Sequence, residues 1–298
     1  MRVTSLGSGS SGNALYVQAG ETAVLVDAGF GIRTLVSRLN QARIAPTQIS
    51  AILVTHEHSD HASGARAFAR RYGIPVISDP RTLNALFAQP EHGVSDITPP
   101  ERVELPIGRT MKIGALEVHS FPVSHDAVAP CGYLLSSAAW RVCFVTDTGA
   151  VSEPITEALR QAHLLVLEAN HDHDRLVAGP YPWHLKQRIL SPTGHLSNAQ
   201  TSKALLSVVD DGPRWLWLAH LSKTNNTPDL ARTHVHEQLR SIGLKHIRPQ
   251  PLPREVGPTW DSAALWSGEH HHATSAAHTA QPAVVASGVT TADDAESA

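Results

Sequence analysis

The stretch from Thr55 to His61, THEHSDH, constrains the fold of this chain more than any other. It places three histidines and an aspartate within six residues. Imidazole nitrogens and carboxylate oxygens are common metal ligands. The apolar run Ala51 to Val54 precedes the cluster, and Gly64 to Tyr72 has helical composition. The sequence therefore predicts a metal-binding turn between a buried strand and a helix. A polar turn in which Asp60 caps the helix is the alternative, and capping does not exclude ligation.

The spacing within this cluster allows two cations. His56 and His58 point to the same side of an extended chain, because successive side chains alternate. Asp60 and His61 follow the bend and can face a second point.

The pattern H-x-H-x-D-H, after a strand and before a helix, resembles the metallo-β-lactamase fold superfamily. The resemblance implies an α/β fold, a four-layer αβ/βα sandwich with metals at one edge of the sheets. We expect residues 1–262 to form this domain. Residues 263–298 are rich in Ala, Ser, Thr and His and predict a low-complexity, disordered tail.

Composition agrees with a soluble protein. Hydrophobic residues make up 42% of the 298 positions and charged residues 17%. No apolar run approaches the roughly 20 residues of a membrane span, and the N-terminus lacks the apolar core of a signal peptide. We therefore expect a cytoplasmic protein without membrane contact. Cys131 and Cys143 are predicted to be reduced core residues.

The resemblance implies three further metal ligands, each at a predicted strand end. His125 follows the strand Leu116 to Phe121, and Asp147 and His220 follow two others. A loop histidine and a turn aspartate before glycine are the alternatives for His125 and Asp147.

The family pattern then assigns two divalent ions, Zn²⁺ or Mn²⁺. Asp147 would bridge them, and a bridging hydroxide would attack the substrate. Asp60 would serve both as ligand and as catalytic residue. The ligands are His56, His58 and His125 for metal one, and Asp60, His61 and His220 for metal two.

Two further residues resemble the ribonuclease Z arrangement. The strand Leu164 to Leu167 ends in Glu168, and His195 follows Gly194. The resemblance implies that His195 is the general acid and Glu168 its orienting partner. A phosphodiester needs such a donor, because its departing alkoxide must be protonated. A loop acid and a helix-flanking polar residue are the alternatives.

Finer motifs narrow the resemblance to the YycJ/WalJ-like branch, whose activity is that of a DNA exonuclease. They include SGSSGN, SHDA, TDTG, EANHD, YPWHLKQRI, GHLSN and LAHLSKTNN. No long inserted arm of the kind that ribonuclease Z uses on transfer RNA is visible. The predicted function is therefore a metal-dependent phosphodiesterase or exonuclease that acts on DNA before RNA. The alternatives are a small-molecule hydrolase of thioesters, lactones or β-lactams, and a regulatory binding protein without turnover.

Charge distribution gives modest support to a nucleic-acid substrate. Between Trp183 and Arg254 there are ten Lys and Arg residues against four Asp and Glu, although the whole chain carries a net charge of −3. A local basic face would attract phosphates, and an ordinary solvated surface is the alternative. The predicted substrate contacts are Lys186, Ser222, Lys223, Asn225 and Asn226. Oligomeric state stays open.

Three other segments carry expectations. The loop Gly7 to Asn13 could bind an anion or simply connect a hairpin. Asp27, in an Asp-x-Gly turn, is expected to be structural and not a ligand. Residues 89–110 hold four prolines and predict a surface loop.

Overall fold

The computed structural model describes residues 1–88, 99–210, 212 and 214–264. Most of the predicted tail, from residue 265, lies outside the described residues, as do residues 89–98 of the predicted surface loop. Met1–Asp261 form one compact unit, which holds every strand described below. No helix in the described ranges is long and apolar enough to cross a membrane.

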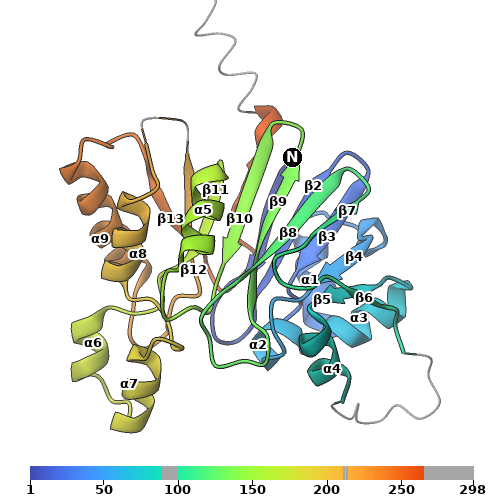
Figure 1. The fold of residues 1–298 in the computed structure, drawn as a ribbon, viewed down its shortest axis with the longest axis horizontal. Helices are drawn as coiled ribbons and strands as arrows, with labels where there is room; N and C mark the ends of the chain where they lie inside the picture. The colour runs from blue at the N-terminus through green and yellow to red at the C-terminus, as the bar shows by residue number, and fades with distance from the viewer. Residues whose placement is uncertain (89–98, 211, 213, 265–298) are drawn as a thin grey trace, which may run out of the picture. The chain divides into compact units, whose positions relative to one another are not determined.

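Two seven-stranded sheets form the centre of this unit (Figure 1). In spatial order, the first sheet consists of β14 (Thr259–Asp261), β1 (Arg2–Gly7), β2 (Ala14–Ala19), β3 (Thr22–Val26), β4 (Ala51–Leu53), β5 (Val76–Ser78) and β6 (Arg102–Glu104). The second consists of β13 (Pro249–Pro251), β12 (Trp215–Ala219), β11 (Leu164–Glu168), β10 (Trp140–Val145), β9 (Cys131–Ser137), β8 (Leu116–Pro122) and β7 (Thr110–Ile113).

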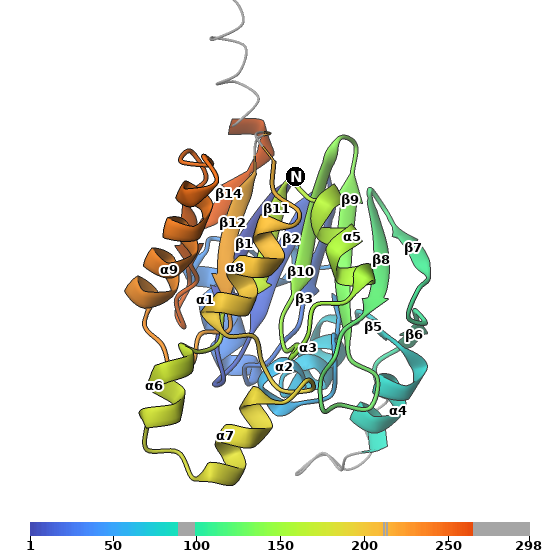
Figure 2. The same cartoon turned by 60° about the vertical axis from the view of Figure 1, so that its left-hand side comes forward.

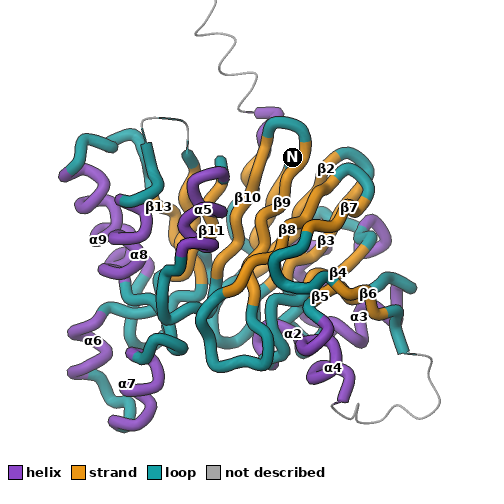
Figure 3. The backbone as a smooth tube through the Cα atoms, viewed as in Figure 1, coloured by secondary structure: helices purple, strands orange, loops and turns teal. Residues whose placement is uncertain are grey.

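Helices cover the outer face of each sheet (Figures 2 and 3). On the first sheet, α1 (Ile32–Gln41) and α3 (Ala65–Tyr72) bury residues such as Leu35 and Phe68 in one core cluster. On the second, α5 (Glu153–Gln161), α8 (Asn198–Leu206) and α9 (Pro228–Ser241) share another cluster with the strands. Leu35 and Leu39 of α1 lie four residues apart and therefore on one face. The predicted four-layer sandwich is confirmed.

Side chains between the sheets join the two halves of the unit. Tyr133 of β9 is fully buried, and its hydroxyl donates to the carbonyl oxygen of Val54, after β4, at 2.8 Å. Trp260 of β14 packs against Trp140 and Trp215 of the second sheet, with ring centroids 5.5 and 5.7 Å apart. Because both faces of each sheet are covered, central strands such as β4 and β12 are apolar along their whole length.

Strand direction brings the predicted ligands to one edge. β3 and β4 run parallel in the first sheet, and β10, β11 and β12 run parallel in the second. Asp27, Asp147 and His220 follow β3, β10 and β12, and each has a left-handed backbone, with φ of 61°, 54° and 55°. Non-glycine residues seldom adopt this conformation, and it is often found at functional sites.

One strand, β6, lies where the sequence predicted a loop. Residues 99–110 were expected to be loop, but β6 pairs in parallel with β5. That prediction was wrong here, because a three-residue edge strand leaves no periodicity to detect. The shorter elements are the 3₁₀ turn Pro46–Gln48, α2 (Ser59–Ala62), α4 (Pro80–Ala88), α6 (His173–Ala178) and α7 (Trp183–Leu190).

Candidate metal centre

Three histidines form the first ligand group. His56 and His58 follow β4, and His125 follows β8. One ring nitrogen from each lies within 4.8 Å of the others. His125 Nε2 is 3.3 Å from His58 Nδ1, too close for two protonated nitrogens and suited to a shared cation. The two sheets thus contribute to the same group.

The second group consists of Asp60, His61, Asp147 and His220, whose ligand atoms also lie within 4.8 Å of one another. His61 Nε2 is 2.9 Å from Asp147 Oδ2, and His220 Nε2 is 3.4 Å from Asp60 Oδ2. Asp147 Oδ1 is 3.8 Å from His125 Nε2. Asp147 therefore lies between the two groups, where a shared carboxylate would stand.

Several buried ligand atoms lack a hydrogen bond within the described residues. They are His56 Nε2, Asp147 Oδ2 and His220 Nε2. The nearest charged neighbours of Asp147 Oδ2 and His220 Nε2 are other members of the second group, His61 at 2.9 Å and Asp60 at 3.4 Å. A buried polar atom without a partner is costly. Nitrogen and oxygen lone pairs that converge in this way fit divalent cations.

Asp27 and Thr55 fix the orientation of two of these imidazoles. His61 Nδ1 donates to Asp27 Oδ2 at 2.7 Å, and the Thr55 amide donates to Asp27 Oδ1 at 2.8 Å. The Thr55 hydroxyl lies 2.9 Å from His56 Nδ1. Each contact occupies Nδ1 and leaves Nε2 facing the cluster, which is the usual arrangement behind a metal-binding histidine. Asp27 is thus placed as a supporting residue.

The loop Gly7 to Asn13 joins antiparallel β1 and β2, so it is a hairpin connection, but it also contacts the centre. The His220 amide donates to Ser8 Oγ at 2.8 Å, and Asn13 Nδ2 is 3.0 Å from His61 Nε2.

The turn after β3 packs closely against the ligand segment. A Cβ on Gly29 would lie 1.7 Å from the Asp60 carbonyl oxygen, so only glycine fits at this position. Asp60 itself lies inside α2, and neither α2 nor α3 has a side-chain cap.

Glu168 contacts two histidines. Its Oε1 accepts from His195 Nδ1 at 2.8 Å and lies 2.9 Å from His220 Nδ1. Its Oε2 accepts from the amides of Thr148 and Leu196 at 3.0 and 3.2 Å. The sequence predicted the His195 contact and missed the one with His220. With Nδ1 engaged, each imidazole has only Nε2 left for other chemistry.

Burial and neighbouring charges shift the pKa values of these groups. Burial would raise the pKa of Glu168, but His195 and His220 beside it lower that pKa to about 2. Burial would lower the pKa of His195, but Glu168 raises it above its usual value. For His220, burial is outweighed by Asp147, Asp60 and Glu168, which raise its pKa to about 10. The contact with Glu168 therefore favours the protonated form of His195.

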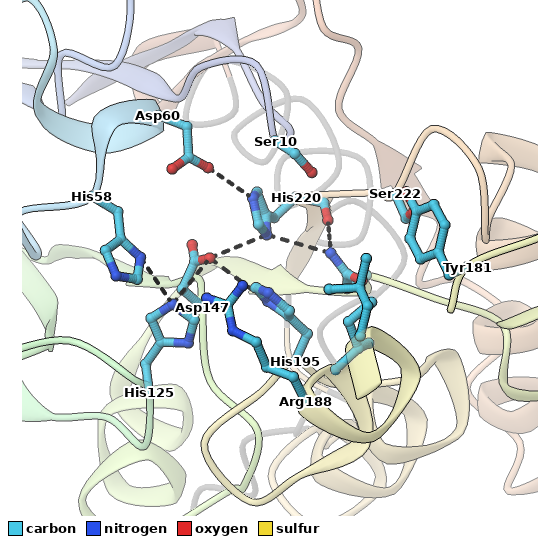
Figure 4. Close-up of a pocket in the computed structure, with 13 residues that line it drawn as sticks. Ser10, His58, Asp60, His125, Asp147, Tyr181, Arg188, His195, His220 and Ser222 are labelled. Atoms are coloured by element: carbon cyan, nitrogen blue, oxygen red, sulfur yellow. Dashed lines mark hydrogen bonds and ion pairs between the residues drawn. The ribbon is translucent and has the colours of Figure 1, made fainter. Parts of the chain in front are cut away.

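A cavity of about 280 Å³ opens onto the centre (Figure 4). Seven of its lining residues were predicted from the sequence: His58, Asp60, His125, Asp147, His195, His220 and Ser222. The other six were not predicted as site residues, although Ser10 lies in the loop considered for anion binding and Arg188 in the basic segment; they are Ser10, Asn170, Tyr181, Leu185, Arg188 and Ile189. Four of these belong to the YPWHLKQRI segment, which was singled out as a motif without a role.

Of the five predicted substrate contacts, only Ser222 lines the cavity. Ser222 lines the cavity, whereas Lys223 is exposed and Asn225 is buried behind it. Lys186 and Asn226 depart from the expectation, because both hold backbone and neither lines the cavity. Lys186 Nζ donates to the carbonyl oxygens of Val177 and Gly179, at 2.6 and 2.7 Å. Asn226 Nδ2 donates to the Ala169 carbonyl oxygen and to Asn198 Oδ1 at 2.9 Å.

Comparisons with known proteins agree with this geometry. The family profile "Beta-lactamase superfamily domain" matches residues 22–221. Exodeoxyribonuclease YycJ of Bacillus anthracis is 40% identical over 239 residues, 80% of this chain and 89% of that protein. Exodeoxyribonuclease WalJ of Streptococcus pneumoniae is 38% identical, over 80% and 88%. The metallo-β-lactamase fold protein YhfI of Bacillus subtilis superposes with a TM-score of 0.67 at 15% identity, over 87% of this chain and 98% of that one.

Proposed function

The chain belongs to the β-lactamase superfamily, in the branch of the YycJ and WalJ exodeoxyribonucleases, and on that premise we propose that it is a dinuclear metal-dependent phosphodiesterase that digests DNA from an end. The observation that carries the proposal is the Glu168–His195 pair. Its imidazole lines the cavity, with Nδ1 2.8 Å from Glu168 Oε1 and 3.6 Å from Asp147 Oδ1.

The proposed ligand sets follow the two groups of side chains. His56, His58 and His125 would hold one cation, Asp60, His61 and His220 would hold the other, and Asp147 would be shared by both. A set of imidazoles and carboxylates without thiolate suits Zn²⁺ and Mn²⁺. Bound divalent cations would activate water at neutral pH and neutralise charge on the phosphoryl oxygens.

His195 protonates the oxygen that leaves when the phosphodiester is cleaved. A nucleoside alkoxide is a poor leaving group, so a positioned acid lowers the barrier. Glu168 holds His195 Nδ1, which directs Nε2 towards the cavity, and it raises the pKa of the imidazole. Asp60 acts from the opposite side of the cavity, as ligand and as a partner of His220 Nε2.

Both relatives described above are exodeoxyribonucleases, which favours DNA as the substrate, and RNA is the second choice. The basic excess between Trp183 and Arg254 agrees with a phosphate-rich ligand. We propose that the enzyme works in the cytoplasm.

The first test incubates the protein with end-labelled single- and double-stranded DNA and with RNA. Each substrate is tested with Mn²⁺, with Zn²⁺ or with a chelator, beside an Asp147→Ala control. Metal-dependent shortening that the variant lacks supports the proposal. No shortening of any nucleic acid, together with hydrolysis of chromogenic esters or lactams, would replace it with a small-molecule hydrolase.

A second test isolates the role of His195. The His195→Gln variant is compared with the parent on DNA and on bis(p-nitrophenyl) phosphate, whose leaving group needs no proton. We expect a loss of kcat on DNA of about 100-fold or more, and a much smaller loss on the nitrophenyl ester. Equal losses on both substrates would show that His195 is not the acid.

A further inference from the structure

Residues 173–190 form a projection beside the metal centre, which we call the α6–α7 arm. It is inserted in the chain between β11 and α8. In both views α6 and α7 extend beyond the end of the second sheet, on the side where α2 carries Asp60 and His61 (Figures 1 and 2).

The arm supplies one wall of the cavity. Tyr181, Leu185 and Arg188 line it together with the predicted ligands. Figure 4 shows Tyr181 on the opposite side of the cavity from His58 and Asp60. A substrate held at the metal centre would therefore touch the arm.

Hydrogen bonds fix the arm at its base. The Lys186 ammonium joins α7 to the last carbonyl groups of α6. Arg175 Nε donates to the Thr224 carbonyl oxygen at 2.9 Å, and the His195 amide donates to the Ile189 carbonyl oxygen at 3.0 Å. Pro180 and Pro182 flank Tyr181 and restrict its backbone to extended conformations. The arm therefore presents its side chains in a preformed arrangement.

Large apolar side chains gather on the outside of the arm. Of the six exposed large hydrophobic residues in the described ranges, three belong to it: Trp183 (60% exposed), Val177 (42%) and Leu190 (36%). Trp183 adds little to any core in this position. An exposed indole near an aromatic cavity wall suits a ligand with flat apolar faces.

Arg188 adds a cation next to the aromatic residues. Its Nε is 2.5 Å from Asp126 Oδ2, and Asp126 Oδ1 lies 3.3 Å from His125 Nε2. The side chain is 56% exposed, and Nε is its only nitrogen with a hydrogen bond in the part of the chain described. The terminal nitrogens can therefore bind a phosphate oxygen at the cavity mouth.

We propose that the α6–α7 arm binds unpaired nucleotides at a strand end, with Tyr181 and Trp183 stacking on bases and Arg188 holding a phosphate next to the cleaved one. This inference rests on the proposed function and names its substrate class. Bases inside a duplex are already stacked on their neighbours, so aromatic residues can take them up only from a single strand or a frayed end. The enzyme then prefers DNA with an overhang to blunt duplex.

The test uses the metal-loaded enzyme and DNA duplexes that are blunt or carry a five-nucleotide overhang. Tyr181→Leu and Trp183→Ala should each raise KM for the overhang substrate about fivefold or more, and kcat should stay within about twofold. Tyr181→Phe keeps the aromatic ring, so its KM should stay close to that of the parent. Ile242→Ala is the matched control, because Ile242 is 52% exposed at the end of α9 and lies outside the arm.

A second readout does not depend on turnover. An oligonucleotide with 2-aminopurine at its end is added to the chelator-treated enzyme, and stacking on Tyr181 or Trp183 should quench its fluorescence. The quenching should be weaker in Tyr181→Leu and in Trp183→Ala and unchanged in Ile242→Ala.

The outcomes separate this inference from the function it rests on. If the parent digests DNA but treats blunt and overhang ends alike, and the arm variants keep KM within twofold, the inference is overturned and the function stands. If the parent digests no nucleic acid and quenches no fluorescence, both are overturned. An overhang preference that the arm variants lose and Tyr181→Phe keeps supports both.

Discussion

The backbone of single residues shows how this centre is held. Asp147 and His220 both adopt positive φ angles, directly after parallel strands of the second sheet. This conformation turns the chain sharply and directs each side chain into the cluster. Its cost, of order 1 kcal/mol or more per residue, is offset by the contacts that the two side chains make there. The amino-acid type at such a position must therefore both tolerate a left-handed backbone and supply an atom that can bind the cation.

Asn adopts a left-handed backbone at least as readily as Asp, so Asp147→Asn tests the charge alone. We expect the variant to fold and to bind at most half of the parent's metal, because a neutral amide is a weak bridging ligand. Metal content per chain, measured by atomic emission, checks this. Asp79→Asn is the control, since Asp79 is also buried but pairs with Arg81 away from the centre. Full metal retention in Asp147→Asn would exclude a shared ligand at this position.

The buried side chain of His171 should make the folded state less stable at acidic pH. It is fully buried, and neither ring nitrogen has a hydrogen bond among the described residues. Burial lowers its pKa to about 4, although Glu168 opposes the shift. The unfolded chain, with a histidine pKa near 6.5, therefore binds this proton more readily than the folded one. The contribution of neutral His171 to stability is complete above about pH 6.5 and is lost as pH falls towards 4.

His171→Leu removes this titration. Relative to the parent, we expect the variant to gain roughly 2 kcal/mol of unfolding free energy between pH 7.5 and pH 5. Urea denaturation at three pH values measures the difference. A difference that does not change with pH would show that His171 is not the titrating group.

Site residues were predicted best where they belong to a local motif or directly follow an apolar run in the sequence. THEHSDH brings four side chains to the centre within one turn, and Asp147 and His220 each follow an apolar strand. Tyr181 and Arg188 could not be placed in the same way, because their contact with the cavity depends on how the arm folds back. Lys186 was misjudged for a related reason, since a lysine near motif histidines can as well bind backbone as phosphate.

At the scale of elements, buried strands were predictable and short helices were not. β4 and β11 each end within one residue of the expected bounds, because apolar runs mark them. By contrast, α6 has six residues and α7 eight, and the four residues between them include two prolines. No helical periodicity can be read from so few positions. The docking of these helices depends on tertiary hydrogen bonds.

The Lys186 ammonium is the clearest of these bonds, and its removal should loosen the whole arm. Lys186→Met keeps an apolar stem but leaves the Val177 and Gly179 carbonyl groups without this donor. We expect amide hydrogen exchange in α6 and α7 to become faster, and the unfolding free energy to fall by roughly 1–3 kcal/mol. Lys203→Met, at an exposed position of α8, is the matched control. Indistinguishable exchange in the two variants would mean that Lys186 does not hold the arm.

At the scale of the whole sandwich, the candidate metal centre joins the two sheets. Four proposed ligands follow β4 of the first sheet, and the other three follow β8, β10 and β12 of the second. Any cation bound there connects parts of the chain that are far apart in sequence. Metal binding should therefore stabilise the folded state of the entire unit and not only the site.

Removal of metal should lower Tm. A ligand at 100 times its Kd adds about 2.7 kcal/mol, which corresponds to a shift of roughly 5–10 °C for a domain of this size. Thermal unfolding with and without chelator, followed by tryptophan fluorescence, measures the shift. In Asp147→Ala the chelator should have a smaller effect. Equal shifts in parent and variant would contradict a centre built around Asp147.

The pairing of β1 with β14 has a consequence for synthesis on the ribosome. Val3 lies opposite Trp260, so β1, the first strand to be synthesised, waits for β14, the last one, before its outer edge is covered. At bacterial translation speeds of about 5–20 residues per second, that interval is on the order of tens of seconds. During this time every nascent chain presents the outer edge of β1 with unpaired amide and carbonyl groups, a template for association with neighbouring chains on the same polysome.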